Sequence, residues 1–122
     1  MAGVGARPVS GPTGQRDREL VTIELLFVEG CPHARQALAE IERAVRWASV
    51  PADISLRRVG DVHEALRVQF LGSPSVRVAG CDVEPGAEAR SDYGIKCRLY
   101  RAAGSAGGTP PALWLREALR RR

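Results

Sequence analysis

The first regular pattern in the chain is an alternation of apolar and polar residues that begins at Val21. Val21, Ile23 and Leu25 are separated by polar residues, and the sequence is then continuously apolar through Val28. Such a run is typical of a strand that is covered on both faces. We therefore predict a central strand over Val21–Val28.

A helical repeat follows from Pro32 to about Ser49, where Pro51 ends it. Ile54–Val59 then alternates as a second strand, and because a helix joins the two strands we expect them to be parallel. The apolar residues of the helix are spaced three and four apart, with charged residues on the opposite side. They are Ala34, Ala37, Leu38, Ile41, Ala44, Val45 and Ala48.

The middle of the chain predicts a short helix and a hairpin. Asp61 with Glu64 has the form of an N-cap followed by an acidic residue, which starts a helix to about residue 70. Ser75–Ala79 alternates as a third strand, and a turn at Gly80 leads into a short return strand over Asp82–Glu84.

The two ends of the chain differ in character. Gly86–Gly108 is polar and rich in glycine, so we predict an extended loop or a partly ordered excursion, and loops of this length are usually functional. A helix starts after Thr109 and carries an apolar stripe to the end of the chain. Residues 1–19 lack apolar periodicity and are predicted to be a disordered tail, which leaves residues 20–122 as one domain of the α/β class.

Composition agrees with one ordinary domain. The chain has 122 residues, of which 44% are hydrophobic and 26% are charged. No stretch approaches the ~18 apolar residues of a membrane span. The N-terminal region lacks the apolar centre of a secretory signal. We therefore expect a cytoplasmic protein with no membrane partner.

The net charge of +4 raises the question of nucleic-acid binding. Four arginines lie in the last turns of the predicted C-terminal helix, where cations complement the helix dipole. The two Trp, two Tyr and two Phe residues do not alternate with basic residues as a base-stacking surface requires. Charge alone therefore does not indicate a nucleic-acid partner.

Cys31 is the main candidate for chemistry. The chain has three cysteines, an odd number that argues against a structural disulfide framework. Cys31 lies where the first strand gives way to the helix, and unpaired N–H groups at a helix start favour a thiolate, the reactive form. The alternative is that Cys31 is a small packing residue at the end of a strand.

The sequence Cys31-Pro32-His33-Ala34, followed later by Ser73-Pro74 and a strand, resembles the thioredoxin superfamily. The resemblance implies a thioredoxin-like β-α-β-α-β-β-α fold with a small mixed four-stranded sheet. In that family two cysteines flank two residues, and the first is the nucleophile; here alanine replaces the second. Pro32 suits the first helical position, and protonated His33 would add positive charge near the sulfur.

The resemblance also implies that the Ser73–Pro74 peptide bond is cis. That geometry places the backbone of Ser73 beside the Cys31 sulfur, where it can pair with an extended thiol substrate, while Pro74 shapes the substrate groove. The alternative is an ordinary trans proline at the start of a strand.

Two other cysteines are candidates for the missing second thiol. The far turn of the hairpin holds Cys81 some ~15 Å or more from Cys31, too far to react. The return strand brings the chain back, so Cys97 can approach Cys31. Tyr93–Tyr100 resembles a Gly-Leu-x-Cys-Arg-x-Tyr element of small bacterial thioredoxin-like proteins. The alternative for Cys97 is a buried anchor of the loop.

The flanking Lys96 and Arg98 would add positive charge near either thiolate. These residues together predict a thiol–disulfide oxidoreductase or thiol-based reductase without a cofactor or resident metal. Cys31 attacks, His33 activates it, and Cys97 resolves the mixed disulfide. The expected partner is a thiol or disulfide, on a protein or a small molecule, and the oligomeric state is left open. Two alternatives are a non-catalytic module that holds a soft metal through its thiolates and a thioredoxin-like interaction domain that has lost its chemistry.

Overall fold

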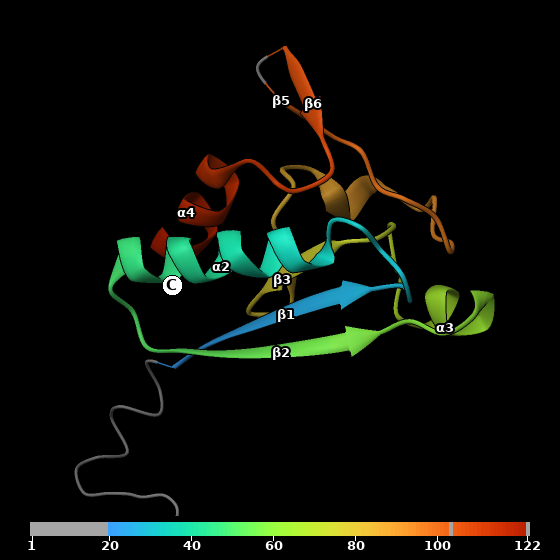
Figure 1. The fold of residues 1–122 in the computed structure, drawn as a ribbon, viewed down its shortest axis with the longest axis horizontal. Helices are drawn as coiled ribbons and strands as arrows, with labels where there is room; N and C mark the ends of the chain where they lie inside the picture. Colours follow the sequence, from blue (N-terminus) through green and yellow to red (C-terminus); the bar gives the residue numbers. More distant parts are fainter. Residues whose placement is uncertain (1–19, 103, 122) are drawn as a thin grey trace, which may run out of the picture.

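The computed structural model describes residues 20–102 and 104–121, so the predicted tail over 1–19 lies outside the described residues. Its centre is a four-stranded mixed sheet in the order β2-β1-β3-β4 (Figure 1). β1 (Val21–Phe27) pairs in parallel with β2 (Ala52–Arg58) and antiparallel with β3 (Ser75–Val78). β4 (Cys81–Asp82) extends the sheet antiparallel to β3. The α/β class and the parallel β1–β2 pair are confirmed.

The helices divide the core into two parts. α2 (Ala34–Ala48) and α4 (Ala112–Arg120) cover one face of the sheet, on the side of Val21, Ile23 and Leu25 (Figure 1). α3 (Val62–Arg67) belongs to a smaller cluster on the other side, around Leu26, Val59, Ala65 and Phe70. Asp61 caps α3 as predicted, because its side chain accepts a hydrogen bond from Glu64 N–H at 2.9 Å. Within the described residues, no helix is long and apolar enough to cross a membrane.

The start of α2 differs from the prediction. The helix begins at Ala34 with His33 as its N-cap residue, so Pro32 is not the first helical residue. The first hydrogen bond of full helical span runs from Ala37 N–H to His33 O at 2.9 Å. Residues before it form a looser turn, in which Cys31 N–H donates to Val28 O at 3.1 Å. Cys31 therefore precedes the helix instead of lying in its first turn.

The β3–β4 hairpin turns at Ala79 and Gly80, whose φ angles of 53° and 84° are both positive. Two such residues characterise the type I′ turn that suits a tight hairpin. β4 comprises only Cys81 and Asp82, so the return strand starts one residue earlier and ends sooner than predicted.

The predicted loop over 86–108 contains regular structure. A 3₁₀ turn, η1, covers Ala87–Ala89, and β5 (Tyr100–Ala102) pairs antiparallel with β6 (Ser105–Gly107) as a separate two-stranded sheet. This hairpin projects from the main body beyond α4 (Figure 1). Strands of this length are too short to show a period of two in the sequence.

Candidate functional site

Cys31 lies on the connection between β1 and α2. Gly30, with a φ of 78°, allows the chain to turn sharply after β1, because residues with side chains rarely adopt this conformation. The turn is closed by the hydrogen bond from Cys31 N–H to Val28 O. Cys31 is a free cysteine, and the residue is half-buried.

Ser73 connects this turn to the segment before β3. Its hydroxyl oxygen accepts a hydrogen bond at 3.0 Å from Val28 N–H, the residue that also closes the Cys31 turn. The Ser73–Pro74 peptide bond is cis, as expected. Ser73 is only 1% exposed and Pro74 is fully buried, so both lie beneath the surface instead of lining an open groove.

Cys97 is brought to the other side of Ser73. Ser73 N–H donates to Lys96 O at 2.8 Å, and Arg98 N–H donates to Ser73 O at 3.0 Å, which makes Ser73 and Cys97 partners in an isolated parallel bridge. The hydrogen-bonding groups of Ser73 that were expected to face a substrate are thus used within the chain. Cys97 is exposed and free, so the alternative of a buried anchor is wrong.

Cys81 lies at the opposite end of the sheet. It pairs with Val78, and Val78 pairs with Ile23 near the start of β1, whereas Cys31 follows the end of β1. Because a strand rises about 3.3 Å per residue, Ile23 and Phe27 alone are separated by about 13 Å. The expectation that Cys81 is remote from Cys31 agrees with this register.

His33 packs against the segment that leads into α4. A methyl group added to Gly108 would lie 2.6 Å from His33 Nε2 and nearer still to two ring carbons. Only glycine therefore leaves room for the ring at its present position. The ring contact fixes His33 at the start of α2, two residues after Cys31.

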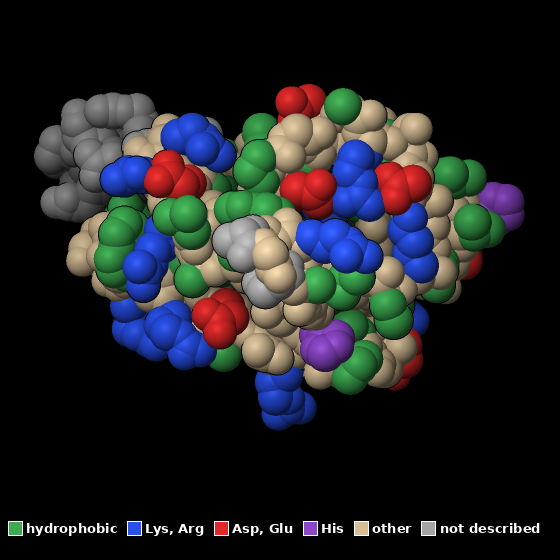
Figure 2. Space-filling model, turned by 90° about the horizontal axis from the view of Figure 1, so that it is seen from above, with side chains coloured by type: hydrophobic (Ala, Val, Ile, Leu, Met, Phe, Trp, Pro, Cys, Tyr) green, Lys and Arg blue, Asp and Glu red, His purple; other side chains and the backbone are tan. Residues whose placement is uncertain are grey.

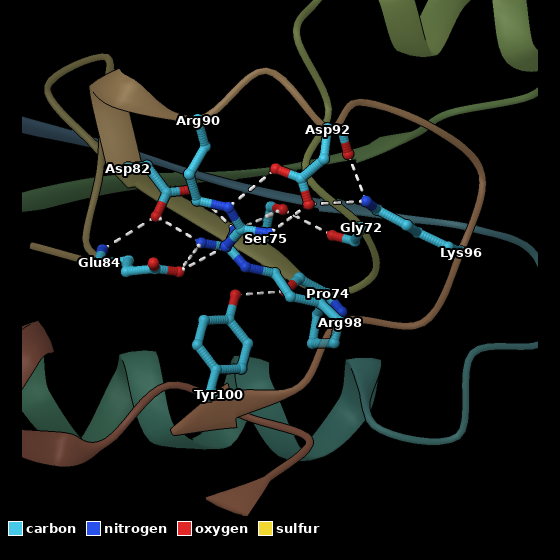
Figure 3. A network of polar contacts seen from close by, with 10 residues as sticks. All are labelled: Gly72, Pro74, Ser75, Asp82, Glu84, Arg90, Asp92, Lys96, Arg98 and Tyr100. Carbon is cyan, nitrogen blue, oxygen red and sulfur yellow. Dashed lines mark hydrogen bonds and ion pairs between the residues drawn. The ribbon is translucent and has the colours of Figure 1, made fainter. Parts of the chain in front are cut away.

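Arg98 forms the centre of a polar network beside the site (Figure 3). Its side chain, 1% exposed, donates to both carboxylate oxygens of Asp82 at 2.7 and 2.9 Å and to Glu84 at 2.8 Å. It also donates to the Ser75 hydroxyl at 2.9 Å. Burial by itself lowers the pKa of the guanidinium, but the hydrogen bonds to Asp82 outweigh it and the pKa lies above its usual value.

This geometry corrects one expectation about the charge near the thiols. The Arg98 guanidinium points toward β4, where two carboxylates neutralise it, and so does not serve as a free cation beside a thiolate. Lys96 is likewise paired, with Asp92 at 2.9 Å. Arg90 binds Asp92 as well, and hydrogen bonds from Arg90 and then Lys96 hold the pKa of the Asp92 carboxyl well below its usual range.

Tyr100 connects the network to the cis-proline segment. Its hydroxyl donates to Pro74 O, and the Arg98 guanidinium lies 4.6 Å from the centre of its ring. Burial raises the pKa of the Tyr100 hydroxyl, so the group remains a donor at neutral pH. The segment that follows Cys97 is therefore attached to the core through Arg98 and Tyr100.

The sequence interpretation missed Tyr100, Asp82 and Glu84 as partners of Arg98. The available signal was the pair of acidic residues on the predicted return strand, Asp82 and Glu84, which are two apart and therefore on one side of an extended chain. Over the described residues, no group of three or more His, Cys, Asp or Glu side chains is arranged to hold a metal ion. On the face shown in Figure 2, basic side chains are interspersed with acidic ones.

The sequence matches no protein-family model, and comparisons with curated proteins and with solved structures found no match.

Proposed function

We propose that the protein is a thioredoxin-like thiol–disulfide oxidoreductase in which Cys31 is the nucleophile. The observation that carries the proposal is the position of Ser73, which is hydrogen-bonded to the Cys31 turn through Val28 and to both neighbours of Cys97. Two chain segments that are distant in sequence, each carrying a free cysteine, are thus hydrogen-bonded to one buried residue. A purely structural cysteine has no need of this arrangement.

The strand order also supports the proposal. A parallel β1–β2 pair, an antiparallel β3–β4 hairpin and two helices on one face resemble the thioredoxin fold. In that fold the nucleophile follows the first central strand, and Cys31 follows β1. The resemblance rests on topology and on the cysteine's place in it.

The reaction begins when the Cys31 thiolate attacks one sulfur of a disulfide R–S–S–R. A bond forms between Cys31 and that sulfur, the substrate S–S bond breaks, and the other sulfur leaves as a thiolate that takes a proton from water. The Cys97 thiolate then attacks Cys31 Sγ, which releases the second R–S⁻ and leaves a Cys31–Cys97 disulfide. An external thiol reductant returns the protein to its dithiol form.

Single-cysteine variants test the assignment. We expect Cys31→Ser to slow strongly the initial reaction of the native protein with oxidised glutathione, measured as the loss of free thiols, because the exposed Cys81 and Cys97 that remain react as ordinary thiols. Cys81→Ser is the matched control, because Cys81 is exposed but distant, and it should react as the wild type does. A Cys31→Ser variant that loses free thiols at the wild-type initial rate would remove Cys31 as the nucleophile.

A further inference from the structure

The backbone of Ser73 has no free hydrogen-bonding group. Ser73 N–H is bonded to Lys96 O at 2.8 Å and Ser73 O to Arg98 N–H at 3.0 Å, and Ser73 is 1% exposed. An extended polypeptide that pairs with another chain needs an exposed N–H and C=O on that chain. At Ser73 residues 96–98 already occupy that place.

Residues 96–98, hereafter the covering segment, are attached to the rest of the protein by contacts of Arg98, of the nearby Tyr100 and of Gly72. Arg98 is anchored by Asp82 and Glu84, and the Tyr100 hydroxyl is bonded to Pro74 O (Figure 3). The segment also lies directly on Gly72, where an added methyl group would be 3.0 Å from Arg98 Cβ and 3.3 Å from Lys96 O. Removing the segment from Ser73 would separate a buried cation from its carboxylates.

The two cysteines, unlike the Ser73 backbone, are at least partly exposed. Cys97 is exposed on the covering segment and Cys31 is half-buried on its turn. A small disulfide can approach a half-buried cysteine without main-chain pairing, whereas an extended polypeptide lacks the two hydrogen bonds that would orient it at Ser73.

We propose that the covering segment excludes extended polypeptides and that the substrate is a small-molecule disulfide. This inference rests on the proposed function of Cys31. It gives the Lys96–Arg98 backbone a definite role, since that backbone fills the pairing position on Ser73, the residue whose hydroxyl is hydrogen-bonded to the Cys31 turn. Exchange with a small disulfide R–S–S–R follows the two steps given above, with the same external thiol as reductant.

The direct test compares two disulfides that share one sulfur chemistry. One is the disulfide of N-acetylcysteine amide, and the other is the disulfide-linked dimer of a short, unstructured peptide with a central cysteine. Each rate is divided by the rate with dithiothreitol, which removes intrinsic reactivity. An extended peptide can lie against Ser73 only by displacing the covering segment, whereas the small disulfide needs no such displacement. Displacement breaks the two hydrogen bonds that the segment makes to Ser73, which correspond to about 10-fold or more, so we expect the normalised rate with the peptide disulfide to be lower by at least that factor. Equal normalised rates would overturn the inference.

A variant of Gly72 tests whether the covering segment causes the preference for the small disulfide. The methyl group of Gly72→Ala would press against the covering segment and should reduce the rate preference for the small disulfide. Gly94→Ala is the control, because Gly94 lies two residues before the segment, has nothing within 4 Å of an added methyl group and should leave that preference unchanged. Gly72 has a φ of 121°, so this variant is also strained. If it does not fold, Tyr100→Phe loosens the same segment by removing the hydrogen bond to Pro74 O. An unchanged preference in the folded loosening variant would contradict the role of the covering segment.

Amide hydrogen exchange separates this inference from the proposed function. Ser73 and Arg98 N–H should both be protected in the native protein, whatever Cys31 does. Exchange of these amides at free-peptide rates would overturn the inference even if Cys31 reacts. Protected amides with no Cys31-dependent reaction toward either disulfide would instead refute the proposed function, and the substrate assignment with it.

Discussion

Replacing Arg98 by methionine should destabilise the protein strongly. The substitution keeps an unbranched side chain but leaves Asp82 and Glu84, which are 11% and 22% exposed, facing the cavity of the lost cation. Breaking a buried ion pair from one side costs about 3–5 kcal/mol. Glu84 retains Arg90 at 2.8 Å, so the lower end, about 3 kcal/mol, is expected. This is a large part of the ~5–15 kcal/mol that keeps a typical domain folded.

Urea unfolding followed by circular dichroism measures the effect. Arg120→Met is the matched control, since Arg120 is 64% exposed and pairs only with Glu117 on its own helix in the described structure. An exposed pair of this kind contributes about 0–1 kcal/mol. Arg98→Lys should fall between the two, because lysine keeps the charge but not the two-point contact with Asp82. A loss below about 1 kcal/mol for Arg98→Met would refute the view that Arg98 anchors the covering segment.

Three further changes probe other contacts. Asp92→Asn should lower the free energy of unfolding near neutral pH. The pKa of Asp92 is depressed in the folded protein, so its contribution to the free energy of unfolding is present above the ordinary value of 3.8 and is lost as pH falls below it. The free energies of unfolding of the two proteins should therefore converge in urea titrations at acid pH. A difference that stays constant with pH would contradict this. Gly108→Ala should displace the His33 ring, seen as shifted imidazole NMR signals and a loss of about 1–3 kcal/mol, while Gly107→Ala, with open space around it, should do neither. Ala79→Gly should raise the urea midpoint by relieving about 1 kcal/mol of strain at a φ of 53°, and a lower midpoint would count against the type I′ turn.

Local sequence patterns predicted β1 and α2, which have long apolar repeats, and α3, which begins at a capping residue. The apolar run of β1 and the helical repeat of α2 each place several apolar residues on one buried face. A pattern of that length rarely arises by chance, so it identifies the element. The Asp61 cap of α3 is a contact between residues three apart, which sequence displays directly.

Contacts between distant segments were harder to predict. The burial of Arg98 depends on Asp82 and Glu84, which lie far from it in sequence, and nothing in the pattern around position 98 marks an inward-facing cation. The bridge between Ser73 and Cys97 likewise joins segments that are distant in sequence, and no local pattern marks it. The predicted return strand leads Cys97 toward the end of the sheet where Ser73 lies, but no sequence pattern shows that the neighbours of Cys97 are hydrogen-bonded to the Ser73 backbone.

The most direct test of the central claim is to map the disulfides formed when the native protein is treated with a small disulfide. We predict that Cys31 is modified first, that a Cys31–Cys97 bond replaces the adduct, and that Cys81 remains a free thiol. Bridged cysteines have Cα atoms within ~7 Å, so this product also reports that the two segments around Ser73 meet. First modification at Cys81 or Cys97, with Cys31 left unreacted, would contradict the account.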